Sequence, residues 1–182
     1  MGMKQILVMM MAVGVVGCSK DTPETSQTAE AEPQIASKPT PEPVSQADEK
    51  LIADPIVEKA VRRELQKPTG KLNEADLEKV TSLDLTFTKI TDVGLKEVAK
   101  LQKLTSLGLA RTQITDAGLK ELTKLRNLKK LSLRGTQITD AGLKEVAKLQ
   151  KLEMLNLTGT KVTKEGVTEL KKALPNCLII GP

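Results

Sequence analysis

The chain has 182 residues, enough for one domain with appendages, and its composition excludes several kinds of site. It contains one Phe and no Tyr, Trp or His, so it lacks the commonest general base, the commonest metal ligand and the base of the usual catalytic triad. The formal net charge of +5 is unevenly spread, because residues 19–50 hold three Lys against seven Asp and Glu while the remainder is basic.

Residues 1–17 have the pattern of a signal peptide. Lys4 gives a short positive start, and residues 6–16 form an uncharged apolar run. As a helix this run would rise about 16 Å, roughly half the hydrocarbon thickness of a bilayer. The run is therefore too short to span a membrane, and we predict a leader that directs export.

The leader ends in Val15-Val16-Gly17-Cys18, which resembles the lipobox of bacterial lipoproteins. The resemblance implies cleavage before Cys18, attachment of lipid (including palmitate) at this cysteine, and a membrane-anchored protein of the bacterial cell envelope, at the outer membrane or facing the periplasm rather than the cytoplasm. Ordinary secretion is the alternative, because Val15 and Gly17 also suit a small-residue cleavage site. Lipidation would leave Cys177 without a partner for an intramolecular disulfide.

Residues 18–50 contain the candidate lipidated cysteine and a segment rich in Pro, Glu, Ser, Thr and Ala. This segment has almost no large apolar side chains, so burial cannot offset the entropy of ordering it. We predict a disordered tether with a span of about 30 Å as a flexible coil.

Residues 51–79 are predicted to form a helical N-terminal cap. Asp54 is a candidate N-cap, Pro55 suits the first helical position, and residues 54–66 place their apolar side chains on one face. A capping box at residues 73–76 predicts a short second helix. The arrangement resembles the cap of internalin-like bacterial repeat proteins, and it would cover the apolar end of a repeat stack.

Residues 80–182 contain four copies of a 24-residue repeat, followed by a partial fifth strand in the ending LPNCLII. Within the second copy, residues 107–109 alternate as a strand does, whereas Leu119, Leu122 and Leu125 recur every three residues as on a helix. Thr115 is a candidate N-cap for that helix, with Asp116 in its first turn. Each unit is thus a short strand, a turn and a short helix, and stacked units would share one core.

The motif L-x-x-L-x-L-x-x-T-x-I-T-D-x-G-L-x-x-L-x-x-L, at residues 104–125, resembles the leucine-rich repeat family. The resemblance implies an α/β solenoid, a short curved right-handed horseshoe arc with strands inside and helices outside. Thr stands where the family usually has Asn, at Thr88, Thr112, Thr136 and Thr160, and a hydroxyl can replace only part of the bonding of an amide. We expect the helical glycines Gly94, Gly118, Gly142 and Gly166 to allow close approach of helix and strand.

No catalytic, cofactor or metal site is predicted, and we do not expect an enzyme. Cys177 lies in an apolar ending, which favours a buried inert thiol over a nucleophile. Asp92, Asp116 and Asp140 recur at helix starts, which explains them without calcium. Columns of Lys beside columns of Glu predict a solvated face of mixed sign rather than a nucleic-acid surface, since no aromatic is placed to stack on bases.

The predicted function is that of a protein-binding module, monomeric and anchored to a membrane by its lipid, which presents its concave strand face, or else its helical face, to a protein partner. The candidate binding residues are Asp84, Arg111, Lys130, Ser132, Arg134 and Asn156. Arg111, Lys130 and Arg134 are expected to lie close together and to accept carboxylate or phosphate groups. The alternatives are a structural envelope component without a discrete ligand, a binder of an anionic envelope polymer, or a surface whose cations serve only solubility.

Overall fold

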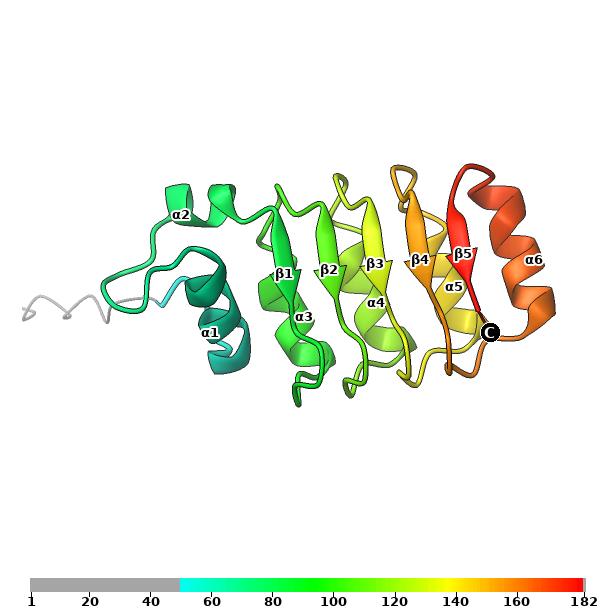
Figure 1. Cartoon of the computed structure of the whole chain (residues 1–182), viewed down its shortest axis with the longest axis horizontal. Helices are drawn as coiled ribbons and strands as arrows, with labels where there is room; N and C mark the ends of the chain where they lie inside the picture. Colours follow the sequence, from blue (N-terminus) through cyan, green and yellow to red (C-terminus); the bar gives the residue numbers. More distant parts are fainter. Residues whose placement is uncertain (1–49, 182) are drawn as a thin grey trace, which may run out of the picture. The chain divides into compact units, whose positions relative to one another are not determined.

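The computed structural model describes residues 50–181, so the predicted signal peptide, the candidate lipidation site Cys18 and the tether up to residue 49 lie outside the described residues. Strands and helices alternate through the described part, and the strands lie side by side in chain order (Figure 1). The elements are α1 (Pro55–Glu64), α2 (Glu74–Lys79), β1 (Ser82–Asp84), α3 (Asp92–Val98), β2 (Ser106–Gly108), α4 (Asp116–Leu122), β3 (Lys130–Ser132), α5 (Asp140–Val146), β4 (Met154–Asn156), α6 (Lys164–Ala173) and β5 (Leu178–Ile180).

The five strands form one parallel sheet in the order β1-β2-β3-β4-β5. The register places the same repeat position opposite itself, so that Leu83, Leu107 and Leu131 lie in one row. The 24-residue period therefore sets both the strand spacing and the alignment of side chains. The fifth strand predicted from the ending is present and pairs with β4.

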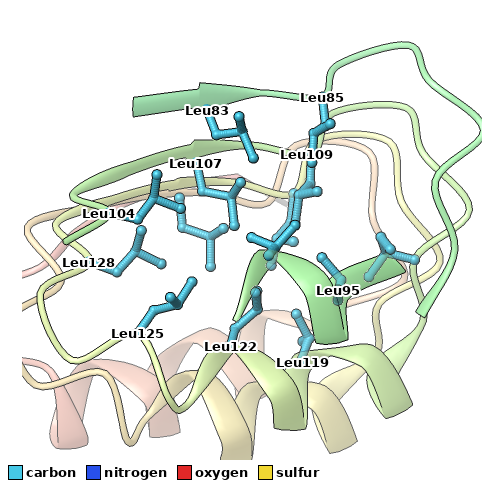
Figure 2. Packing of buried hydrophobic residues seen from close by; sticks show 14 of the residues in the cluster. Leu83, Leu85, Leu95, Leu104, Leu107, Leu109, Leu119, Leu122, Leu125 and Leu128 are labelled. Carbon is cyan, nitrogen blue, oxygen red and sulfur yellow. The ribbon is translucent and has the colours of Figure 1, made fainter. Parts of the chain in front are cut away.

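The core lies between the strands and the helices, as Figure 2 shows for the leucines of the first repeats. All the repeating aliphatic positions predicted for it are buried except Val167, which is partly buried in α6. Burial of one such side chain stabilises the fold by about 1.5–3 kcal/mol before entropy is counted. The periodic leucines thus provide the main driving force for stacking.

The N-terminal cap forms as predicted. Asp54 Oδ1 accepts hydrogen bonds from the backbone N–H groups of Ile56 (2.8 Å) and Val57 (3.0 Å) at the start of α1. Asn73 and Asp76 make a reciprocal capping box at the start of α2. Helix α1 packs against β1 and α3, where Val57 and Ala60 join the core. No helix within residues 50–181 is long and apolar enough to cross a membrane.

An aspartate at the start of each of the first three repeat helices, α3, α4 and α5, binds the next repeat. Asp92 accepts from the backbone N–H of Thr115 at 2.9 Å and from its hydroxyl at 2.6 Å. Asp116 binds Thr139 and Asp140 binds Thr163 in the same way. Because each threonine is also the N-cap of its own helix, the Thr-Asp pair in the repeated decapeptide joins neighbouring helices as well as starting them.

This contact corrects the predicted role of three glycines. A Cβ on Gly118, Gly142 or Gly166 would collide with the carboxylate of the preceding repeat's Asp92, Asp116 or Asp140. The close approach is thus between one helix start and the next, not between helix and strand. Sequence spacing alone could not show this, since each carboxylate precedes the glycine that it contacts by 26 residues.

The threonines at the Asn position bond within their own repeat. The hydroxyls of Thr112 and Thr136 donate to the carbonyls of Leu109 (2.7 Å) and Leu133 (2.6 Å), three residues earlier. Both threonines are buried, and each hydroxyl satisfies a carbonyl at the end of its strand. The threonine thus makes a hydrogen bond within its own repeat, which is one part of the bonding expected of an asparagine at this position.

Candidate binding face

The exposed side of the sheet carries three rows of side chains, which we call the strand face. The first row is Ser82, Ser106, Lys130, Met154 and Leu178; the second is Asp84, Gly108, Ser132, Asn156 and Ile180; the third follows the strands and is Thr86, Ala110, Arg134 and Thr158. These residues are partly or fully exposed, whereas the leucines between them are buried. The predicted alternation of inward and outward side chains is confirmed.

The structure separates the three cations that we expected to find together. Lys130 begins β3, and Arg134 lies four residues later, about 13 Å along the strand direction. Arg111 does lie beside Arg134, because its backbone N–H donates to the Arg134 carbonyl at 2.7 Å. The expected three-cation cluster is therefore an Arg111–Arg134 pair at one end of the strands and a separate Lys130 at the other.

None of these three cations forms a salt bridge within residues 50–181. On the outer helices the lysines are treated differently, since Lys100, Lys124 and Lys148 pair with the glutamates three residues before them. Those pairs confirm the mixed-sign helical face. The strand face thus keeps cations whose charge the described chain does not neutralise.

The polar members of the predicted site have local partners. Asp84 Oδ1 accepts from the backbone N–H of Thr86 at 2.9 Å, and Asn156 Oδ1 accepts from that of Thr158 at 3.0 Å. The hydroxyl and backbone N–H of Thr86, and more weakly the charge of Arg63, lower the pKa of Asp84. Both side chains therefore fix the chain as it leaves the strand, and Ser132 lies half-buried between them.

One position in each repeat, directly after the third row, has left-handed backbone geometry. It is occupied by Phe87 (φ 61°), Arg111 (φ 52°), Gly135 (φ 65°) and Gly159 (φ 71°), which we call the turn column. In Figure 1 it lies beyond the arrowheads of β1 to β4. Glycine is the residue that adopts this geometry without steric cost. The first two repeats therefore hold large side chains where the last two have glycine.

Phe87 and Arg111 contact each other in this column. The guanidinium carbon of Arg111 lies 5.3 Å from the centroid of the Phe87 ring, a cation–π geometry. Phe87 is 71% exposed, although it is the one aromatic residue of the sequence. Our sequence reasoning missed Phe87; the signal was its alignment with Gly135 and Gly159 at the same repeat position.

The strand face also has an apolar end that the sequence reasoning did not select. Met154, Leu178 and Ile180 are exposed on β4 and β5, and the register places Met154 beside Leu178. The strand face thus carries its cations, Lys130 and Arg134, on the third repeat and ends in aliphatic side chains on β4 and β5.

The other candidate chemistry is accounted for by structure. Both oxygens of Asp92, Asp116 and Asp140 accept hydrogen bonds from threonines, which explains these carboxylates without a metal. Cys177 is buried, and burial raises the pKa of its thiol. An inert core thiol is the role its position supports.

Comparison with known proteins shows what the repeats are similar to. Leucine rich repeat models match residues 77–99 and 102–162. No curated protein sequence matches the chain. An internalin C2 from Listeria monocytogenes has a similar structure, with 27% sequence identity and a TM-score of 0.56, over 71% of this chain and 54% of that one. The chain therefore spans about half the length of that internalin.

Two more distant structures share the fold alone. The Mex67:Mtr2 subunits of Chaetomium match at 22% identity and a TM-score of 0.50, over 69% of this chain and 87% of that one. The leiomodin-1 actin-binding site 2 matches at 16% identity and a TM-score of 0.50, over 71% and 80%. With the parallel sheet and its alternating helices, these findings show that the fold is a leucine-rich repeat solenoid.

Proposed function

Starting from this leucine-rich repeat fold, we propose that the chain is a protein-binding module anchored in a bacterial cell envelope. Leucine-rich repeat proteins commonly bind protein partners and are typically scaffolds rather than catalysts. The binding site we propose is the first part of the turn column, Phe87 and Arg111, together with the neighbouring Arg134. The exposed Phe87–Arg111 pair is the observation that carries the proposal.

Steric cost supports a role beyond folding for this pair. A side chain with left-handed backbone costs about 1–2 kcal/mol relative to glycine. An exposed cation–π contact stabilises by only about 0.5–1 kcal/mol. This is less than the backbone strain of the two residues together. Residues held at such a cost concentrate at functional sites. Aromatic and arginine side chains are also the residue types that dominate binding energy at protein interfaces.

A photocrosslinking experiment tests this site. The photoreactive benzoyl analogue of phenylalanine replaces Phe87 in one version of the full chain and Lys120, on the outer face of α4, in a matched control. Position 87 is expected to crosslink to a discrete partner in the native envelope, and position 120 is not. Equal crosslinking from both positions, or none from position 87, would contradict the proposal.

A binder of an anionic envelope polymer is the second candidate. It is supported by Arg111, Lys130 and Arg134, which form no salt bridge in the described residues. This function predicts that retention on an immobilised anionic glycan falls when the three cations become Ser and is unchanged when Phe87 becomes Gly. The protein-binding function predicts that partner capture falls in both variants. A purely structural component would show no capture to lose.

The proposed anchor is lipid attached to Cys18, supported by the apolar run and the lipobox-like residues before it. The Cys18→Ala chain is then expected to move from the detergent phase to the aqueous phase on phase partitioning. Retention of that variant in the detergent phase would contradict lipid anchoring while leaving the binding site untouched.

A further inference from the structure

The junction between the cap and the first repeat contains a cleft separate from the turn column. Its volume is about 700 Å³, and it is open to solvent on one side. This size lies in the range of about 300–1,000 Å³ that is usual for ligand sites. The lining residues are Pro55, Ile56, Lys59, Ala60 and Arg63 from α1, Asp84 from the end of β1, and Thr88 and Lys89 from the turn that follows.

The charges around this cleft are compensated only in part. Lys59, Arg63 and Lys89 form no salt bridge within residues 50–181. The one carboxylate in the lining, Asp84, already accepts from Thr86, while Arg63 donates to the Asp84 backbone carbonyl at 2.7 Å. The cleft therefore holds three cations against one carboxylate, which leaves its lining with a net positive charge.

The neighbouring positions of the same helix do contain an ion pair. There Glu58 binds both Lys50 (2.5 Å) and Arg62 (2.9 Å). Lys59 and Arg63 are four residues apart on α1, and like charges at that spacing repel. On helix α1 Arg62 thus has a carboxylate partner, whereas Lys59 and Arg63, which line the cleft, have none in the described part of the chain.

The floor of the cleft narrows the ligand class. Pro55 and Ile56 give most of the apolar surface between the cations, with the largely buried Ala60 beneath them. A bare phosphate or polyanion would gain nothing from that surface. A long acyl chain would need more enclosed apolar area than three side chains in an open cleft provide. A short peptide segment with carboxylates beside an aliphatic side chain satisfies both the charge and the floor.

We infer that this cleft is a binding site for an acidic peptide segment that carries an aliphatic residue. The site is distinct from the turn column and does not depend on the function proposed there. Arg63 and Lys89 reach the carboxylates, Lys59 lies on α1 with Arg63, and the aliphatic side chain covers Pro55 and Ile56. Lysine and arginine side chains suit this role because their charge-assisted hydrogen bonds to carboxylates are stronger than hydrogen bonds between neutral groups.

The test uses the full chain and a labelled short peptide of alternating Glu and Leu. Replacing Lys59, Arg63 and Lys89 with Gln is expected to weaken binding by about tenfold or more. A matched control replaces Lys96, Lys120 and Lys144 on the outer helices with Gln, which removes the same charge and should change the affinity by less than about twofold. Equal weakening by both triple variants would overturn the inference, because it would show attraction to net charge alone.

Changes in the peptide test the same site without altering the protein. The peptide with Gln in place of Glu and the peptide with Ser in place of Leu are each expected to bind about tenfold more weakly than the Glu–Leu peptide. Undiminished binding of the Ser peptide, or equal competition by inorganic phosphate, would overturn the acidic–aliphatic assignment. Undiminished binding of the Gln peptide would overturn the role of the cations.

Discussion

The turn after each strand has the same left-handed backbone in all four repeats but carries different side chains. In the first two repeats it holds Phe87 and Arg111, which contact each other, and in the last two it holds Gly135 and Gly159. The neighbouring core positions show no such division, since the strand and turn aliphatics are buried alike in every repeat. The repeats are therefore equal in what folds them and unequal at the one position where large side chains oppose the backbone geometry.

Core substitutions should cost the same stability in early and late repeats. Leu131→Ala should lower the free energy of unfolding by about 2–5 kcal/mol, because Leu131 is buried in the middle of the sheet. Leu107→Ala, one repeat earlier, should fall in the same range. Lys144→Ala on the outer helix should stay within about 0.5 kcal/mol. Denaturant unfolding measures all three, and equal values for Leu131→Ala and Lys144→Ala would mean that inside and outside are wrongly assigned.

The next largest loss of stability is expected at the contact between the starts of α4 and α5, where Gly142 lies against Asp116. Gly142→Ala should destabilise by about 1–3 kcal/mol, because the new Cβ would collide with Asp116 and disturb its two bonds to Thr139. Ala141→Gly, at the exposed neighbouring position, controls for the helix itself and should cost about 1 kcal/mol or less. A Gly142→Ala protein as stable as wild type would contradict the inferred close contact between Gly142 and Asp116.

Replacing the glycines in the late half of the turn column with alanine should lower the free energy of unfolding. Gly135→Ala is expected to cost about 1–2 kcal/mol, since its φ of 65° is unfavourable for a residue with a Cβ. The added Cβ would also lie 3.2 Å from Arg111 Cγ, whereas at Gly159 it would meet nothing closer than 3.9 Å. Chemical denaturation should therefore show Gly135→Ala at least as destabilised as Gly159→Ala. The reverse order would contradict the packing described for the column.

Acid should weaken the junction between the last repeats. The hydroxyl and backbone N–H of Thr163 lower the pKa of Asp140 below its ordinary value of 3.8. A carboxyl whose pKa is lower in the folded chain contributes stability above its unfolded value and loses it as pH falls through the folded value. Unfolding measured from about pH 6 downward should thus show a smaller acid loss for Asp140→Asn than for wild type. If the free energy of unfolding fell equally with pH in both proteins, the Asp140 carboxylate would not contribute to stability.

The sequence predicted the parts of this molecule that depend on local or periodic patterns. The leucine spacing specified the sheet, the helices and the core, and the Asp54 and Asn73 caps followed from residues a few positions apart. The bonds from Asp92, Asp116 and Asp140 were missed because their threonine partners lie 23 residues away and are also adequate caps by themselves.

The binding face was predicted only in part for a similar reason. Alternation along the strands correctly placed Lys130 and Arg134 on the exposed side, but four residues of extended chain separate them by about 13 Å, which the expected three-cation cluster did not allow for. The importance of Phe87 depends on backbone geometry and on its contact with Arg111 from the next repeat. Neither is visible without the turn that the stacked repeats impose.

The central claim is that Phe87 and Arg111 are kept for binding and not for folding. In the Phe87→Gly/Arg111→Gly variant, relief of about 1–2 kcal/mol of backbone strain per site is offset by the flexibility of glycine in the unfolded chain and by loss of the cation–π contact. The free energy of unfolding should therefore stay within about 1 kcal/mol of wild type. Partner capture by the same variant from an envelope extract, measured beside its unfolding curve, should be lost. Full capture by a stable double-glycine protein, or a large loss of stability in it, would contradict the claim.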